Sequence, residues 1–102
     1  LPPGDLTIVA SILADKDADE MLRTLRSAGS TFVATRSSSA RALPAQELAA
    51  IAKKHFDSVE AIDDPVAALT RAHELGEPVL VTGSLYLLGD LAQAERRAGW
   101  RR

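Results

Sequence analysis

Val79-Leu80-Val81-Thr82-Gly83-Ser84 is the stretch that decides how this sequence is expected to fold. Its first part, residues 79–82, is a short apolar run rich in β-branched side chains, which is typical of a strand buried within a sheet. Pro78 precedes the run, and Gly83 and Ser84 follow it as turn residues. Apolar residues then recur at helical spacing, at Leu85, Leu88, Leu91 and Ala92. The stretch therefore predicts a strand, a tight turn and a helix, in that order.

Three further strand patterns lie upstream. The run LTIVASIL at 6–13 is nearly continuous and apolar, TFVAT at 31–35 is rich in β-branched residues, and 58–62 is a weaker pattern. Helical patterns separate these strands. The alternation predicts an α/β fold with a parallel sheet, right-handed crossovers and helices on both faces. The length of 102 residues suits a single domain spanning 1–102.

Cap residues mark the expected helices. Asp17 and Glu20 resemble a capping box, Pro44 suits a first helical turn, and Asp64 followed by Pro65 suits an N-cap. The residues expected to face the sheet are Met21, Leu22, Leu25 and Ala28 in the first helix and Val66, Leu69 and Ala72 in the third. Gly29 and Gly76 are expected to end these two helices, and the second helix is expected to end near Lys54.

Composition and charge exclude some classes of function. The formal charge of −2 and an isoelectric point near 5.6 argue against a surface that neutralises many phosphates, so nucleic-acid binding is not expected. The sequence has no cysteine for a disulfide or a thiolate metal site. Its start, Leu1-Pro2-Pro3-Gly4, is typical of a linker rather than a signal peptide, and no apolar run is long enough to span a bilayer. We therefore expect a cytoplasmic domain cut from a longer protein, with no membrane partner.

The turn at Gly83 and Ser84 is the first candidate site. Ligands of open parallel sheets bind at the carboxyl ends of the strands, where loops and helix N-termini meet. A residue without a side chain lets an anionic group approach the free backbone N–H groups of a helix N-terminus, and Ser84 adds a hydroxyl. The alternative is structural, with Gly83 permitting a tight turn and Ser84 capping a helix. The residues alone leave both interpretations open.

Two further loops are expected at the same edge. Residues 36–41 carry the guanidiniums of Arg36 and Arg41 around three serines, and guanidiniums bind carboxylate or phosphate through paired hydrogen bonds. Asp15-Lys16-Asp17 could hold a phosphate or a metal ion, but an aspartate cap and an exposed ion pair explain it without a function, and a metal is not favoured. Either loop is also consistent with a solvated surface.

Several kinds of site are not expected. His55 and His73 are far apart in the sequence and lack a patterned carboxylate, serine or cysteine partner, so neither predicts a metal site or a catalytic triad. The sequence contains neither G-x-x-x-x-G-K-[ST] nor G-x-G-x-x-G, the usual devices for cradling a nucleotide. We therefore expect no catalytic residue, no metal ligand and no ATP hydrolysis by this chain alone.

Three segments, in the same order, resemble the C-terminal domain of the folylpolyglutamate and dihydrofolate synthases, which belong to the Mur ligase superfamily. They are SILADKD at 11–17, RALP at 41–44 and VTGSLYL at 81–87. The resemblance spans nearly the whole chain, and the ordered set is specific although each piece is short. It implies a Rossmann-like sheet and an ATP-dependent amide ligase that adds L-glutamate to folate or dihydropteroate through an acyl phosphate.

The resemblance also implies roles for partners and residues. ATP and Mg²⁺ would sit mainly on a preceding P-loop ATPase domain of the same protein, which is absent from this chain, so the isolated chain would be inactive. Ser84 and the N–H groups beside Gly83 would bind a carboxylate of L-glutamate, and Tyr86 would help to shape that pocket. Arg41, Lys16 and Asp15 would supply charged contacts at the domain interface.

Two departures from the family pattern accompany the resemblance. The Asp-Gly-Ala-His-Asn-Pro motif that begins the family's C-terminal domain is missing, so we expect the sheet to lack the first strand and helix of the intact domain. Ala40 stands where members often carry proline. Rival interpretations are the C-terminal domain of a muramyl-peptide ligase and a stand-alone, non-catalytic α/β binding domain. The sequence does not distinguish a monofunctional from a bifunctional synthase, and it does not fix the oligomeric state.

Overall fold

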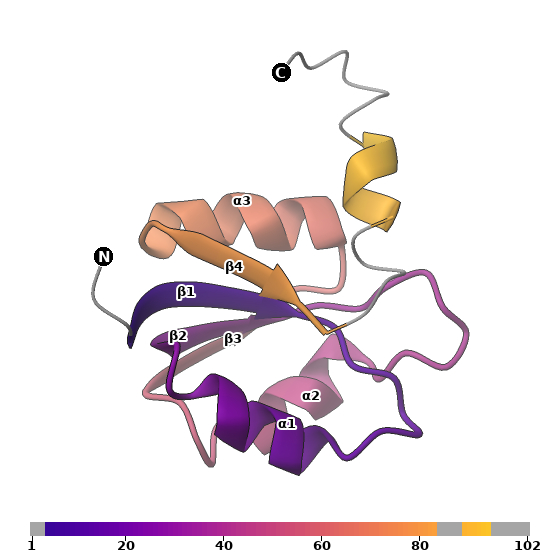
Figure 1. Cartoon of the computed structure of the whole chain (residues 1–102). Coiled ribbons are helices and arrows are strands. Elements are labelled where there is room, and N and C mark those ends of the chain that lie inside the picture. Colours follow the sequence, from indigo (N-terminus) through magenta and orange to yellow (C-terminus); the bar gives the residue numbers. More distant parts are fainter. Residues whose placement is uncertain (1–3, 84–88, 95–102) are drawn as a thin grey trace.

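A four-stranded, all-parallel sheet forms the centre of the molecule (Figure 1). The structure is a computed structural model and describes residues 4–83 and 89–94. The strands are β1 (Gly4–Ala10), β2 (Gly29–Ala34), β3 (Ser58–Ala61) and β4 (Val79–Thr82), in the spatial order β3-β2-β1-β4. All three pairs of neighbours are parallel, which confirms the predicted sheet.

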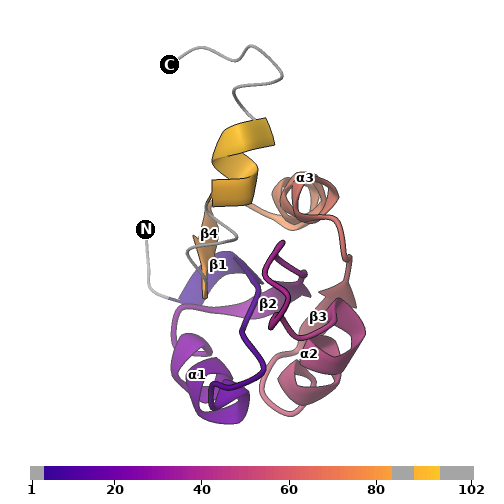
Figure 2. The ribbon, with the colours of Figure 1, turned by 90° about the vertical axis from the view of Figure 1, so that its right-hand side faces the viewer.

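Helices cover both faces of the sheet, as predicted. Helices α1 (Ala18–Leu25) and α2 (Ala45–Ala52) lie on one face, and α3 (Pro65–Leu75) lies on the other (Figure 2). The alternating side chains of β1 and β2 divide between two cores. Ile8 and Phe32 pack against α1 and α2, whereas Val9 and Val33 pack against the alanines of α3. All four strand residues have no exposed surface, so the two central strands are covered on both sides.

The two aspartate caps that the sequence predicted are present, whereas Pro44 is the N-cap of α2 and precedes its first turn. The Asp17 carboxylate accepts a hydrogen bond from the backbone N–H of Glu20 at 3.1 Å, and that of Asp64 accepts one from Ala67 at 2.9 Å. Pro65 occupies the first position of α3, where its missing N–H costs nothing. Gly76 is the C-cap of α3, as expected.

Several predicted boundaries are wrong. Strand β1 ends at Ala10 rather than residue 13, and β2 begins at Gly29 rather than residue 31. Gly29 does not end the first helix, because α1 already ends at Leu25 with Arg26 as its C-cap. Helix α2 ends at Ala52, and a tighter turn follows through Lys54.

The predicted inward face of α3 is confirmed at Ala72 and wrong at Val66. Val66 is 40% exposed, whereas Ala68 and Ala72 are fully buried against the sheet. Alanine at these positions lets the helix backbone approach the strands closely. The expected last helix is described only over residues 89–94, which are helical, so Leu85 and Leu88 lie outside the described residues. No helix in the described ranges is long and apolar enough to cross a membrane.

Candidate functional site at the carboxyl edge of the sheet

The loops that follow β1 and β2 run side by side at the carboxyl edge. The backbone N–H of Ala14 donates to the carbonyl of Arg41 at 2.7 Å, and that of Leu43 donates to Ile12 at 2.9 Å. Leu13 and Ala42 form an antiparallel bridge between these two bonds. Loops 11–17 and 36–44 are therefore paired with each other and form one structural unit.

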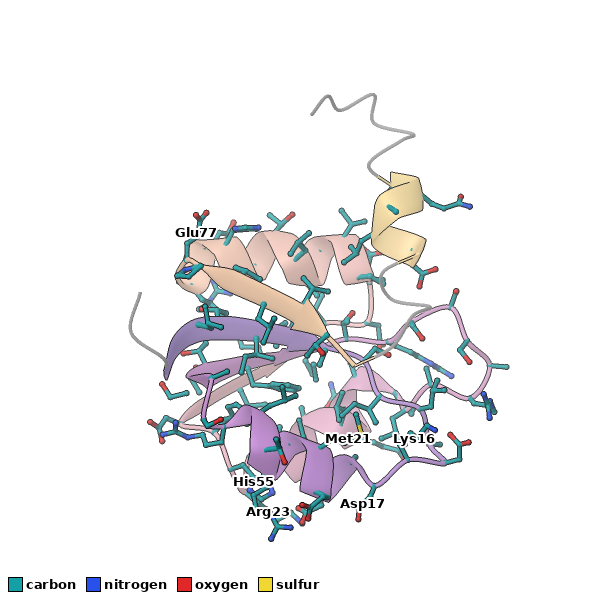
Figure 3. The ribbon with its side chains drawn as sticks, in the orientation of Figure 1. Lys16, Asp17, Met21, Arg23, His55 and Glu77 are labelled. Carbon is teal, nitrogen blue, oxygen red and sulfur yellow. The ribbon has the colours of Figure 1, made fainter. Side chains whose placement is uncertain are left out.

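This pairing brings two predicted site residues together. The Arg41 Nη1 lies 2.9 Å from Asp15 Oδ2, and both side chains are more than half exposed. Lys16 is exposed beside them, and no ion pair is formed by its side chain within the described part of the chain. Figure 3 shows Lys16 at the loop end of the molecule and Glu77 at the opposite end of the sheet. The charges expected at this edge are thus present and open to solvent.

A series of serine hydroxyls holds the backbone of loop 36–41. Ser11 Oγ accepts from the N–H of Ser37 at 2.9 Å, Ser37 Oγ accepts from Ser39 at 3.4 Å, and Ser39 Oγ accepts from Arg41 at 3.2 Å. Ser11 has no exposed surface, and Ser37 and Ser39 are also buried. We call Ser11, Ser37 and Ser39 the serine ladder. It fixes the loop from the end of β1 as far as the backbone of Arg41.

Gly83 lies directly against this ladder. Its φ of 105° falls in the region that favours glycine, and a Cβ atom at this position would lie 2.5 Å from the carbonyl oxygen of Ser11. Both the backbone angle and the close approach therefore require glycine. The structural interpretation of Gly83 is therefore supported directly, and its role in ligand binding stays a prediction. Ser84 and Tyr86 lie outside the described residues.

Asp63 anchors the beginning of the same loop. Its carbonyl oxygen accepts from Thr35 Oγ1 at 3.0 Å and from the N–H of Arg36 at 3.3 Å. Its carboxylate accepts from the N–H of Ala45 at 3.2 Å, at the start of α2, where Pro44 as the N-cap has no side-chain oxygen to do so. Asp63 therefore caps a helix that is distant in the sequence. The exposed side chain of Arg36 is not brought to the Asp15–Arg41 pair by any hydrogen bond within the described residues.

The strongest electrostatic perturbations lie away from this edge. A hydrogen bond with His55 and a second with Lys54 lower the pKa of Asp19. Two hydrogen bonds from Arg71 lower the pKa of Glu60, and the same pair raises the pKa of Arg71. Both histidines have a carboxylate partner that the sequence pattern did not reveal, since His55 lies 2.8 Å from Asp19 and His73 lies 3.0 Å from Glu77. None of these pairs includes a nucleophile, so they act as structural contacts.

Metal ligands do not gather at the carboxyl edge. In residues 4–83 and 89–94, no group of three or more histidine, cysteine, aspartate or glutamate side chains is arranged to hold a metal ion. Asp15 is engaged by Arg41, and Asp17 caps α1.

Sequence reasoning missed two residues at this edge. Ser11 was part of an apolar run, and nothing local shows that its hydroxyl supports a loop 26 positions away. Asp90 Oδ2 accepts the N–H of Ser38 at 2.8 Å across 52 positions. Each of these residues is a polar side chain within or beside an apolar pattern, which marks it as unusual. The pattern does not show which residue it bonds to.

These features define a class of protein, a Rossmann-like α/β domain whose polar loops gather at the carboxyl edge of a parallel sheet. No protein-family model matches the sequence, and no curated protein gives a significant match. Solved structures do match.

The matching structures are folylpolyglutamate synthases. The chain is similar to the enzyme of Mycobacterium tuberculosis complexed with ADP and AMPPCP, with a TM-score of 0.79, 30% identity, and coverage of 94% of this chain and 24% of that one. It is similar to the enzyme of Thermotoga maritima with a TM-score of 0.75, 31% identity, and coverage of 95% and 22%. The chain therefore resembles the C-terminal part of folylpolyglutamate synthases and spans about a quarter of their length, which confirms the resemblance expected from the sequence.

Proposed function

We propose that this chain is the glutamate-ligase domain of an ATP-dependent ligase that adds L-glutamate to folate or to dihydropteroate. In this reaction the amine of L-glutamate attacks an acyl phosphate of the pterin substrate, an amide bond forms and phosphate leaves. The domain would hold L-glutamate in position for that attack. Bringing two reactants into a reactive geometry is itself a large source of rate enhancement.

The observation that carries the proposal is the constrained turn at Gly83. This turn presses on Ser11 at the carboxyl edge, and the ladder that begins at Ser11 continues to Arg41 and its partner Asp15. The chain that carries this arrangement matches folylpolyglutamate synthases over 94% of its length at 30% identity. Similar solved structures at this level of identity support a shared task more strongly than fold alone.

The proposal assigns roles to the residues of this edge. Ser84 and the backbone N–H groups beside Gly83 would bind a carboxylate of L-glutamate, because a hydroxyl and free amides suit an anion. Tyr86 would shape the pocket around the glutamate side chain. Arg41 and Lys16 would contact anionic groups at the junction with a neighbouring domain, and Asp15 would orient the Arg41 guanidinium.

ATP and Mg²⁺ belong to a different part of the proposed enzyme. The structure of the Mycobacterium tuberculosis synthase was solved with ADP and AMPPCP, and this chain covers 24% of that protein. We assign the nucleotide and the metal ion to a P-loop domain of the same polypeptide. On this assignment the isolated domain is inactive, and the whole protein acts in the cytoplasm on soluble substrates.

The full reading frame that contains this chain provides the test. The purified protein is incubated with ATP, Mg²⁺ and either tetrahydrofolate or dihydropteroate, and ADP formation is measured with and without L-glutamate. We expect ADP formation to depend on L-glutamate with at least one pterin. If ADP formation is independent of L-glutamate with each of the two pterins, the proposed function is overturned.

A further inference from the structure

Asp90 connects the helical segment at 89–94 to the loop after β2. Its Oδ2 atom lies 2.8 Å from the backbone nitrogen of Ser38, and the Asp90 side chain is half-buried whereas Ser38 is exposed. Figure 1 shows this segment, in yellow, beside the loops at the carboxyl end of the sheet. A carboxylate that accepts a backbone N–H makes a charge-assisted hydrogen bond, which is stronger than a bond between neutral groups.

The bond from Asp90 falls next to the first bond of the serine ladder. The N–H of Ser37 donates to Ser11 Oγ, and the next N–H along the chain, that of Ser38, donates to Asp90. Two successive amides of loop 36–41 are therefore tied to two different parts of the chain. One attachment is the buried end of β1, and the other lies in the helical segment that follows β4.

These two attachments act on the loop that carries Arg41, in addition to the bond between the Arg41 carbonyl and the N–H of Ala14. From Ser37 the ladder runs through Ser39 to the backbone N–H of Arg41. The ladder's own bonds lengthen along the way, from 2.9 Å at Ser11 to 3.4 and 3.2 Å farther out. The Asp90 contact at 2.8 Å is shorter than any of them and lies in the outer, exposed part of the loop. Without it, the loop would be held through the ladder and its pairing with residues 11–17.

We propose that Asp90 is a positioning residue that fixes loop 36–41 and, through it, the guanidinium of Arg41 for contact with an anionic substrate group. This inference rests on the proposed function. Asp90 acts through the loop and does not touch the substrate. Small displacements of a group that positions a substrate have large effects on rate, so loss of the Asp90 contact in the middle of the loop should impair turnover at limiting substrate.

The test compares variants of the full-length protein. Asp90→Ala removes the acceptor, Asp90→Asn keeps an oxygen that can accept the Ser38 N–H, and Asp57→Ala is a matched control that removes an exposed carboxylate paired with Arg26 elsewhere. The KM for L-glutamate and kcat are measured for each variant and for Asp90→Ala combined with Arg41→Ala. Amide hydrogen exchange at Ser38 is recorded in parallel.

We expect Asp90→Ala to raise KM roughly threefold to tenfold with kcat within about twofold of wild type, a size typical of coupled neighbours. Asp90→Asn should recover most of the loss, and Asp57→Ala should resemble wild type. In the Arg41→Ala background Asp90→Ala should add little, because the group that it positions is gone. Exchange at Ser38 should be faster in Asp90→Ala alone.

Three results distinguish a failure of the positioning role of Asp90 from a failure of the proposed function. An unchanged KM in Asp90→Ala, or a loss that adds fully to that of Arg41→Ala, would overturn the positioning role and leave the proposed function intact. A wild-type protein without L-glutamate-dependent ADP formation would overturn the proposed function and the kinetic role together. Unchanged exchange at Ser38 in Asp90→Ala would show that Asp90 does not hold the loop, whatever the activity.

Discussion

The two edges of the sheet differ in how much side chains contribute to their hydrogen bonds. At the amino edge the connections are held by backbone groups: Leu6 donates to Ala28, Thr7 to Pro78 and Asp57 to Ser30, at 3.0 to 3.1 Å. At the carboxyl edge, side-chain oxygens accept further bonds beside the backbone ones, and these acceptors are Ser11, Ser37, Ser39, Asp63 and Asp90. The amino edge is thus specified mainly by chain geometry, whereas the carboxyl edge depends on particular side chains.

This difference indicates where stability and function are concentrated. A hydrogen bond between backbone groups survives most side-chain substitutions. It is lost when a larger side chain clashes with the neighbouring strand, so the amino edge is sensitive to steric bulk. A single substitution at the carboxyl edge removes only the hydrogen bonds of that side chain, so this edge can be altered without loss of the fold. Binding sites on loops that a rigid scaffold positions show this second behaviour.

Gly29→Ala should give the largest effect, at the amino edge. A Cβ on Gly29 would lie 1.8 Å from the carbonyl oxygen of Leu6 and 2.8 Å from its carbon, so the backbone of β1 or β2 must move. We expect the free energy of unfolding to fall by about 3 kcal/mol or more, as for other severe backbone clashes. Chemical denaturation measures the change.

Gly89→Ala is the matched control for that substitution. A Cβ on Gly89 meets nothing within 4 Å, so alanine should be neutral or stabilise by up to about 1 kcal/mol in a helix. Equal effects of the two substitutions would contradict the claim that the amino edge is limited by close packing.

Ser11→Ala should give an intermediate effect, at the carboxyl edge. It leaves the N–H of Ser37 without its acceptor in a buried position, which costs about 1–3 kcal/mol in the free energy of unfolding. Amide exchange in loop 36–41 should accelerate while the central strands stay protected. Ser27→Ala removes an exposed hydroxyl bonded to Thr24 and should change stability by less than about 0.5 kcal/mol. A Ser11→Ala variant as stable as Ser27→Ala would show that the ladder does not support the loop.

The smallest expected effect on stability comes from acidification, which acts on the Glu60–Arg71 ion pair. Because Arg71 lowers the pKa of Glu60 in the folded protein, the ionised pair stabilises the fold at neutral pH, and this contribution is lost as pH falls below the ordinary carboxyl range through the lowered pKa. The pair is partly exposed, so Glu60→Gln should cost only about 0.5–1 kcal/mol near pH 7. Denaturation of both proteins at pH 7 and below pH about 4 should show the difference shrinking. A difference that grows in acid would contradict the assigned pKa direction.

Local signals in the sequence were sufficient for much of the fold. Strand β4 was predicted at its observed bounds because Pro78 and Gly83 delimit it on both sides. Asp17 and Asp64 were predicted as caps because a cap acts on residues only three positions away. On α3 the prediction was right for Ala72 and wrong for Val66, because hydrophobicity favoured valine whereas close packing on the sheet favours alanine.

The candidate site could be predicted only in part. Gly83, Asp15, Lys16 and Arg41 lie at the predicted edge, since topology brings the carboxyl ends of parallel strands together there, and their role in binding stays a prediction. The bonds that organise this edge were not predictable, because Ser11 with Ser37 and Asp90 with Ser38 are partners at separations of 26 and 52 positions. Such pairs depend on how the whole chain folds, and no periodic pattern encodes them.

The KM for L-glutamate of Ser84→Ala in the full-length protein is the most direct test of the claim that the carboxyl edge holds L-glutamate. Ser84 follows the constrained Gly83 in the sequence, and Ser27→Ala is the control. We expect KM to rise about tenfold or more with kcat less affected, because one hydrogen bond to a charged group is lost. An unchanged KM for L-glutamate would contradict the assignment of this turn to glutamate binding.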